Sequence, residues 1–190
     1  MSIKGQEKAS LNAVLKGLCV YDKFMESSCK GYDFTTCTFG KGGAVVADKG
    51  EVIVLQYDTT DPSLKGKKCF LSTEIGNFKN LISLQLNNIY GVKGYLSGKI
   101  PTEIGNLTNL TNPLQLNNNN LTGPIPTEIG NLNSLTAPIY LNYNHLTGSI
   151  PTEIGKLNTC CLYLSNNNLT GPIPTEIGNM KLLNDIRLNN

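Results

Sequence analysis

Hydrophobic and polar residues recur in a fixed order from about residue 70 to the end of the chain. Three stretches carry the string L-x-L-x-x-N-x-L, and they begin at Leu114, Ile139 and Leu162. Side chains alternate between the two faces of a strand, so the L-x-L part predicts a short strand with both aliphatic residues on one face. The predicted strands are 84–86, 114–116, 139–141 and 162–164.

A tetrapeptide repeat sets the period of this pattern. Thr-Glu-Ile-Gly begins at Thr73, Thr102, Thr127, Thr152 and Thr175, at intervals of 29, 25, 25 and 23 residues. A single coil of this length has nothing to cover its apolar face, whereas stacked coils bury a continuous column of Leu and Ile. The repeat therefore predicts a solenoid of about six coils. We expect a parallel sheet on its concave side and short 3₁₀ or irregular turns opposite.

The asparagine of each string lies where the coil turns away from its strand. Its amide can satisfy backbone groups that no sheet ladder reaches, and stacked copies can link neighbouring coils. Beyond it, a glycine permits a tight bend and an Ile-Pro pair favours extended backbone. We expect Asn119, Asn144 and Asn167 to be buried and to form an asparagine ladder, a row of side chains hydrogen-bonded from coil to coil. The tight bends are expected at Gly123, Gly148 and Gly171.

These strings resemble the plant-type subclass of the leucine-rich repeat family, written LxxLxLxxNxLxGxIPxxIGxL, from Phe70 to Asn190. The resemblance implies an α/β solenoid, a right-handed superhelix with a parallel concave sheet and an N-terminal cap. Repeats of this subclass have about 24 residues, and here the central ones depart from that length. Two of them place an extra residue before the strand, as Asn112-Pro113 and Ala137-Pro138. Since proline lacks the N–H that a ladder uses, we expect a bulge or a shortened strand there.

The chain divides into residues 1–70, an N-terminal cysteine-containing cap with a first degenerate coil, and residues 71–190, an array of about five coils. Within the first part, apolar residues at helical spacing predict a helix in 7–24, and a Val- and Ile-rich run predicts a strand in 50–58. This order is similar to the N-terminal cap of extracellular plant-type leucine-rich repeat proteins. The first coil is expected to start near Val52. The final stretch ends without a recognisable C-terminal cap.

Four cysteines, at positions 19, 29, 37 and 69, lie in this first part, which is otherwise short of core residues. Disulfides are therefore expected, with Cys29–Cys37 the favoured pair and the pairing of Cys19 and Cys69 open. Reduced thiols in a cytosolic protein are the alternative. The sequence contains no Cys-x-x-Cys pair, so a metal site is not predicted. The adjacent Cys160 and Cys161 are expected to be buried thiols, with Cys160 on a core leucine position.

Composition narrows the classes of partner. The chain has 16 Lys and Arg against 14 Asp and Glu, a formal net charge of +2, which argues against nucleic acid as a partner. It has 24 asparagines and only 16% charged residues. No stretch approaches the roughly 20 apolar residues that span a bilayer, and no signal peptide is visible. The resemblance implies a secreted or cell-surface protein, and a cytoplasmic one is the alternative.

Catalytic chemistry is not predicted. The recurring Glu74, Glu103, Glu128, Glu153 and Glu176 occur once per coil, which predicts a solvated ridge rather than a paired acid and base. His145 is the single histidine, and the repeat supplies no nucleophile beside it. We therefore expect a non-enzyme with no catalytic residue, metal or cofactor.

The expected ligand-binding surface is the concave face, where the residue between the two strand aliphatics points to solvent. These positions vary along the array, unlike the constant Thr-Glu-Ile-Gly ridge, and tyrosine offers contact area at a low entropic cost. Tyrosine is also simply a good strand residue, so both interpretations stay open. The candidate residues are Gln85, Gln115, Asn117, Tyr140, Asn142, Tyr143, Tyr163, Ser165 and Arg187.

The leading hypothesis is a non-catalytic module that binds a protein, peptide or glycan partner in recognition or defence, as the resemblance to receptor-kinase ectodomains and polygalacturonase-inhibiting proteins implies. An ice-binding surface and an intracellular scaffold are the alternatives. Unequal coil lengths argue against the regular lattice that ice binding needs. Asn-Leu-Thr triplets match the N-glycosylation pattern but also arise from the repeat itself; they begin at Asn106, Asn109, Asn120 and Asn168.

Overall fold

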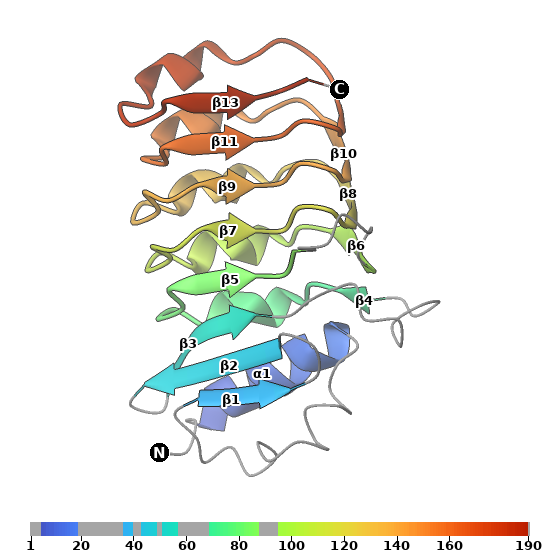
Figure 1. Cartoon of the computed structure of the whole chain (residues 1–190), viewed down its shortest axis with the longest axis vertical. Coiled ribbons are helices and arrows are strands. Elements are labelled where there is room, and N and C mark those ends of the chain that lie inside the picture. The colour runs from blue at the N-terminus through green and yellow to red at the C-terminus, as the bar shows by residue number, and fades with distance from the viewer. Residues whose placement is uncertain are drawn as a thin grey trace.

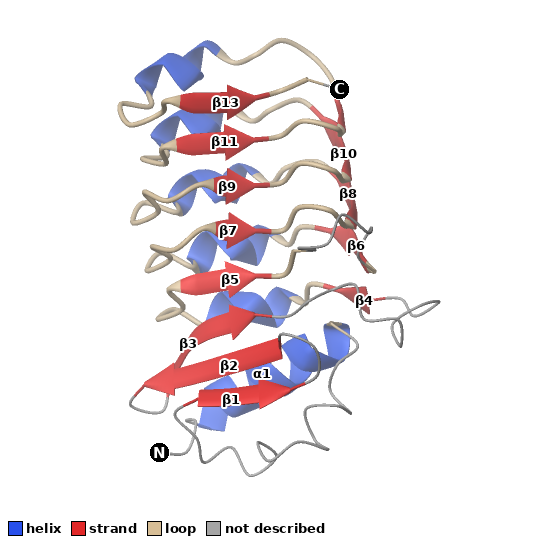
Figure 2. Cartoon of the chain, viewed as in Figure 1, coloured by secondary structure: helices blue, strands red, loops and turns tan. Residues whose placement is uncertain are grey.

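In the computed structural model, the chain folds as a stack of coils along one axis (Figure 1). The structure describes residues 5–18, 36–39, 43–48, 51–56, 69–87 and 95–189, with the backbone alone for the strands within 36–56. Five successive coils each contribute a strand to a main sheet, a strand to a second sheet and a 3₁₀ helix (Figure 2). This is the α/β solenoid that the repeat predicts.

The main sheet has eight strands in the order β1-β2-β3-β5-β7-β9-β11-β13. Its first two pairs are antiparallel, and every pair from β3 onwards is parallel. The strands are β1 (Thr36–Phe39), β2 (Gly43–Asp48), β3 (Glu51–Gln56), β5 (Ser83–Gln85), β7 (Leu114–Gln115), β9 (Ile139–Tyr140), β11 (Cys161–Tyr163) and β13 (Asp185–Arg187).

The predicted strands all occur in this sheet, and two of them are shortened as expected. β7 and β9 have two residues each, whereas β5, β11 and β13 have three. Pro113 and Pro138 stand directly before the two short strands. A proline has no N–H to donate to the neighbouring strand, so the ladder begins one residue later there.

A second, five-stranded parallel sheet lies beside the first, at a position that the sequence did not reveal. Its order is β12-β10-β8-β6-β4. Gly123, with φ 75°, makes the bend that was predicted after the asparagine. The strands of this sheet have only two to four residues each, too few to show an alternating pattern in the sequence. The strands are β4 (Cys69–Phe70), β6 (Leu96–Lys99), β8 (Asn120–Gly123), β10 (His145–Gly148) and β12 (Asn168–Leu169).

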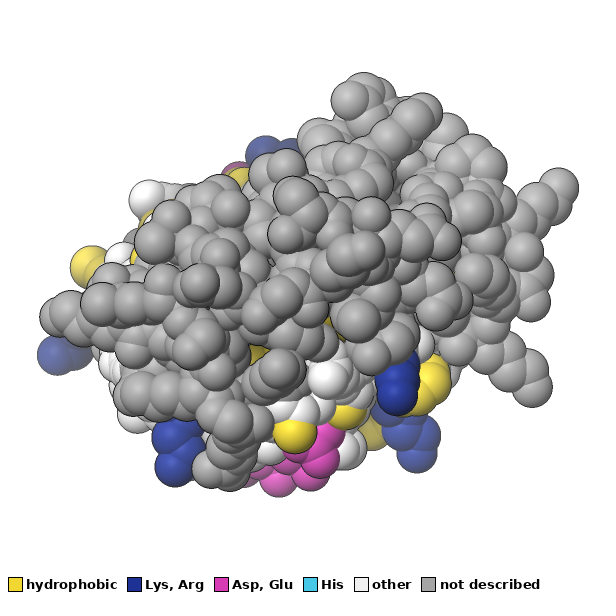
Figure 3. All heavy atoms as spheres, turned by 90° about the horizontal axis from the view of Figure 1, so that it is seen from below, with side chains coloured by type: hydrophobic (Ala, Val, Ile, Leu, Met, Phe, Trp, Pro, Cys, Tyr) yellow, Lys and Arg dark blue, Asp and Glu magenta, His cyan; other side chains and the backbone are white. Residues whose placement is uncertain are grey.

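The Thr-Glu-Ile-Gly segments form 3₁₀ helices on the side away from the main sheet, and no longer helix occurs in the described part of 100–190. In the central coils, the isoleucine is buried and the glutamate lies in the first turn. In the view from the end where α1 lies, acidic side chains gather along one edge (Figure 3). The helices are η2 (Thr73–Asn77), η3 (Thr102–Asn106), η4 (Thr127–Asn131), η5 (Thr152–Lys156) and η6 (Thr175–Asn179).

One apolar column runs through the stack, from the N-terminal helix to the last coils. Helix α1 (Gly5–Gly17) covers the first coil with Leu11, Val14 and Leu15, all fully buried, as the helical spacing predicted. Ser10 also donates a hydrogen bond of 3.1 Å to Glu74 of η2. Helix α1 therefore joins the array by both packing and polar contacts.

The cysteines are placed as follows. Cys69 is buried and disulfide-bonded, and Cys29 lies outside the described residues, so the Cys29–Cys37 pair stays a prediction. The interpretation of Cys160 as a core residue is wrong. Thr159 fills the core position instead, fully buried, and donates a hydrogen bond of 2.6 Å to the carbonyl of Ala137. This coil is shorter than the two before it, with 23 residues against 25, so the residue that faces the core is shifted by one position and Cys160 is half-buried.

Candidate functional site

One row of side chains crosses the parallel strands on their outer face. The register pairs Gln85 with Gln115, Gln115 with Tyr140, Tyr140 with Tyr163, and Tyr163 with Arg187. In the central strands each of these residues stands between two buried aliphatic residues, so the backbone directs it away from the core. We call this row the strand-face row. The sequence predicted its members and their order.

The C-terminal end of the row is an aromatic and charged cluster. The rings of Tyr140 and Tyr163 stack with centroids 4.9 Å apart and an interplanar angle of 23°. The guanidinium of Arg187 lies 4.8 Å from the centre of the Tyr163 ring, a cation–π contact. Asp185 accepts hydrogen bonds from the Tyr163 hydroxyl at 2.8 Å and from Arg187 at 3.1 Å. These contacts fix the ring faces before any ligand arrives.

Protonation in this cluster follows from its hydrogen bonds. The pKa of the Asp185 carboxyl is lowered, chiefly because the carboxylate accepts from Tyr163 and then because it accepts from Arg187. The pKa of Tyr163 is raised, first by donating to Asp185 and then by desolvation. The phenol therefore stays protonated at physiological pH and donates its hydrogen bond to Asp185.

A hollow of about 430 Å³ opens over this cluster. Asn142 is one of the lining residues, and its buried Oδ1 atom has no hydrogen-bond partner among the described residues, although buried polar groups are normally paired. Three predicted residues, Gln85, Gln115 and Asn117, belong to earlier coils and do not line it. We call it the strand-face hollow; its lining is Tyr140, Asn142, Tyr143, Tyr163, Ser165, Asn166, Arg187 and Asn189.

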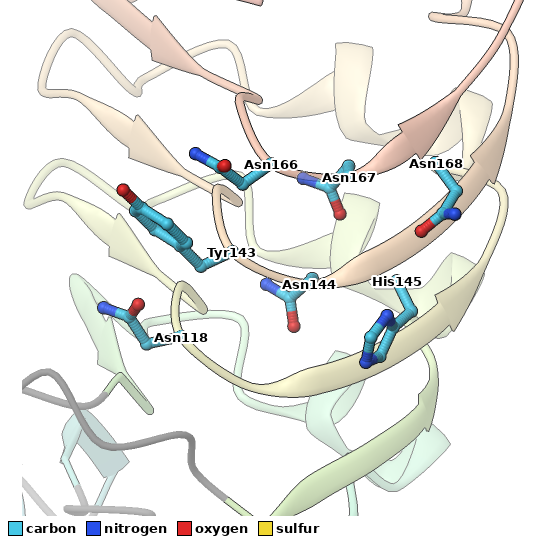
Figure 4. A pocket seen from close by; sticks show the side chains of 7 residues that line it. All are labelled: Asn118, Tyr143, Asn144, His145, Asn166, Asn167 and Asn168. Atoms are coloured by element: carbon cyan, nitrogen blue, oxygen red, sulfur yellow. The ribbon is translucent and has the colours of Figure 1, made fainter. Parts of the chain in front are cut away.

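A second hollow, of about 390 Å³, lies around the bend that connects the two sheets (Figure 4). Tyr143 lines both hollows. The sequence interpretation placed Tyr143 beside the strand-face row but did not identify this site, although a signal existed, since Tyr143 and His145 stand where neighbouring repeats have asparagine. We call it the bend hollow; its lining is Asn118, Tyr143, Asn144, His145, Asn166, Asn167 and Asn168.

The asparagine ladder lies beneath the bend hollow and holds the coils together. Asn119, Asn144 and Asn167 are all buried. The amide of Asn144 donates to the carbonyl of Leu116 in the preceding coil and to that of Leu141 in its own, at 3.0 Å each. Because these amides are engaged in backbone contacts, their role is structural.

The described residues contain no group of three or more His, Cys, Asp or Glu side chains that could hold a metal ion. Four of the ridge glutamates are neighbours of threonines that donate hydrogen bonds to them, at 3.2–3.3 Å, rather than members of acid–base pairs. In the part of the chain that is described, no helix has both the length and the apolar character needed to cross a bilayer.

Sequence comparison identifies the repeat. The family model described as Leucine Rich Repeat matches residues 114–132, 139–157 and 158–180. The matches cover three successive coils, including the strands and the 3₁₀ helices that flank both hollows. A search of the curated proteins finds no match.

Solved structures share the fold over nearly the whole chain. The crystal structure of PEPR1–AtPEP1 matches with a TM-score of 0.75 and 28% identity, over 97% of this chain and 24% of that one. The Arabidopsis receptor kinase HAESA, in complex with the peptide hormone IDA and the co-receptor SERK1, matches with a TM-score of 0.64 and 25% identity, over 97% and 33%. The BIR3–SERK2 complex from Arabidopsis thaliana matches with a TM-score of 0.66 and 25% identity, over 96% of each chain. The chain thus spans about a quarter to a third of the first two.

Proposed function

This chain is a plant-type leucine-rich repeat protein, and from that premise we propose that it is a non-catalytic binding module for a protein, peptide or glycan partner. The strand-face hollow carries the proposal. It combines a stacked tyrosine pair and a guanidinium in one concavity. Tyrosine and arginine are the residues most often found at the energetic centre of interfaces.

The stacked tyrosine pair gives the strongest support, because two ring faces and the neighbouring guanidinium offer contact area within one concavity. The complexes of PEPR1 with AtPEP1 and of HAESA with a peptide hormone show relatives of this fold engaged with partners.

We place the protein at the cell surface or outside the cell. The disulfide at Cys69 supports this, because structural disulfides persist mainly in oxidising compartments. Thiol counting on the denatured, unreduced protein from its native source tests the assignment. Two reactive thiols, Cys160 and Cys161, are expected, whereas an intracellular scaffold would show all six.

The ice-binding alternative receives less support from the geometry. Its candidate surface is the threonine row of the ridge, and those hydroxyls already donate to the neighbouring glutamates, from Thr102 to Glu103 for example at 3.2 Å. The coil spacing of 25, 25 and 23 residues is also uneven. A measurable thermal hysteresis of the purified protein would reverse this ranking.

The binding test compares two double variants against a partner captured by the protein from native extracellular fluid. Replacing Tyr140 and Tyr163 by alanine should weaken binding by about 2 kcal/mol or more, because the central aromatic anchor is lost. Replacing Glu128 and Glu153 by glutamine should leave affinity unchanged. Isothermal titration calorimetry measures both, and circular dichroism confirms the fold. Loss of binding in the glutamate pair with retention in the tyrosine pair would refute the assignment to the strand face.

A further inference from the structure

We infer that the bend hollow is a second recognition site that takes an uncharged sugar ring of an oligosaccharide. The inference rests on the proposed binding function and names the chemistry of one ligand. It starts from a comparison of the equivalent bend positions in successive coils, where two residues of one coil differ from those of its neighbours.

The first departure is Tyr143. It has φ 56°, as do the equivalent Asn118 and Asn166 in the flanking coils. Asparagine adopts this left-handed conformation readily, whereas a bulky aromatic residue is disfavoured there. The ring is 51% exposed, so it contributes little to the core. A residue that the backbone disfavours and the core does not need is a candidate for function.

The second departure, His145, belongs to the same coil. Neighbouring coils have Asn120 and Asn168 at this position, and His145 is exposed. Both departures line the same hollow: the Tyr143 ring projects from the bend beside Asn166, and the imidazole stands at the other end of the hollow (Figure 4). Two independent changes from the repeat therefore converge on one concavity.

The lining of the bend hollow has no charged Lys, Arg, Asp or Glu side chain, in contrast to the strand-face hollow with its Arg187. An anionic or cationic ligand would lose its hydration here without gaining a counter-charge. The lining instead presents one aromatic ring, an imidazole and the side chains of Asn118, Asn166 and Asn168, with no aliphatic side chain. The amides of Asn144 and Asn167 also line it but are already bonded to backbone carbonyls. Sugar hydroxyls both donate and accept, which matches amides, and the C–H face of a pyranose can pack on an aromatic ring. The volume of about 390 Å³ falls in the range of small-ligand sites.

A peptide main chain fits the bend less well. Recognition of an extended peptide by strand addition uses unpaired backbone groups at a strand edge, and the backbone N–H groups of this bend are already bonded to the next coil. Asn118 donates to Asn142 at 3.0 Å, and Tyr143 donates to Ser165 at 3.0 Å. The hollow therefore presents side-chain amides rather than a ladder, which favours a ligand rich in hydroxyls.

The test uses linear neutral hexasaccharides of glucose, mannose and xylose, with hexagalacturonate and a set of uncharged decapeptides as comparators. Saturation-transfer NMR detects weak contacts, and calorimetry measures affinity. Tyr143→Asn and His145→Asn restore the residue of the flanking coils, so both variants should fold. The matched control is the Tyr140→Ala and Tyr163→Ala double variant, which alters only the strand-face hollow.

At least one neutral hexasaccharide is expected to bind, with affinity at least about tenfold weaker in Tyr143→Asn and changed less than about twofold in the control. Absence of binding up to about 10 mM overturns the inference. So does binding that is lost in the control but kept in Tyr143→Asn, and so does preference for hexagalacturonate or the decapeptides. The proposal for the strand-face hollow has its own test, the affinity of the Tyr140→Ala and Tyr163→Ala double variant for the captured partner. It can therefore hold even if the bend hollow binds no sugar.

Discussion

At the scale of single residues, the ladder asparagines join coils because each one bonds to backbone groups of its own coil and of the preceding coil. Asn144 donates to the carbonyls of Leu116 and Leu141 and accepts from the N–H of Leu121, at 3.0 Å each. The two carbonyls directly follow strands β7 and β9, and the N–H of Leu121 lies in β8. A buried backbone group without a partner is destabilising, so one side chain protects three such groups.

Asn144→Ala should therefore lower the free energy of unfolding by about 1–3 kcal/mol, because it leaves backbone groups unpaired inside the protein. Urea unfolding followed by circular dichroism measures the change. The control is Asn133→Ala, since Asn133 is exposed and should be nearly neutral. An equal effect of the two substitutions would show that the ladder contacts contribute little.

The acidity of Asp185 provides a second test at this scale. Its pKa lies below the ordinary value of 3.8 because it accepts hydrogen bonds from Tyr163 and Arg187. A lowered folded-state pKa means that this carboxylate stabilises the fold above the ordinary pKa, and that the contribution disappears as the pH falls through the folded-state value. Tyr163→Phe should raise the Asp185 pKa towards 3.8, as followed by carbon NMR titration. An unchanged pKa would mean that Arg187 alone sets it.

At the scale of elements, the 3₁₀ helices stack so closely that their glycines face the backbone of the next coil. A Cβ built on Gly105 would lie 2.4 Å from the carbonyl oxygen of Glu128, and one on Gly130 would lie 2.5 Å from that of Glu153. Backbone atoms cannot move aside as a flexible side chain can. The constancy of Thr-Glu-Ile-Gly is thus explained by contact between helices.

Gly105→Ala should destabilise the protein by about 1–3 kcal/mol through overpacking between η3 and η4. Gly178 of η6 provides a matched control, because nothing lies within 4 Å of a Cβ built there. Gly178→Ala should be neutral or slightly stabilising, since alanine restricts the unfolded chain. Thermal unfolding compares the two. Similar losses of stability in both variants would rule out close helix stacking as the cause.

At the scale of the whole molecule, stability is distributed along one axis, because each coil contacts chiefly the coils next to it. The central coils are covered on both sides and their aliphatic residues are fully buried. The last described coil differs, with Ile173 59% and Leu182 50% exposed. Its strand, β13, pairs on one side only in the described part of the sheet.

Amide hydrogen exchange should therefore show a gradient along the stack. The N–H of Leu116, bonded to Tyr140 in a central coil, should exchange much more slowly than the N–H of Leu164, bonded to Arg187 beside the edge strand. Native-state exchange by NMR at several pH values measures both. Equal protection of the two amides would indicate that the stack opens only as a unit.

The amino-acid pattern is sufficient to predict the repeat, the strand positions, the shortened strands after Pro113 and Pro138, and the order of side chains along the strand-face row. These features follow from local rules: alternation across a strand, the missing proline N–H, and the need of a half-buried coil for neighbours. The family resemblance added the plant-type architecture, which the match of the repeat model and the solved structures bear out.

The other features depend on contacts that form only in the folded protein. The second sheet forms because short extended segments of successive coils pair with one another. The shift that buries Thr159 in place of Cys160 depends on how a shortened coil is held by its neighbours. Likewise, the stacked tyrosines, the orphan Asn142 oxygen and the bend hollow arise from side chains of separate coils. These contacts depend on which residues of adjacent coils lie opposite each other. The periodic sequence alone does not give that alignment, because it is set when the coils pack together.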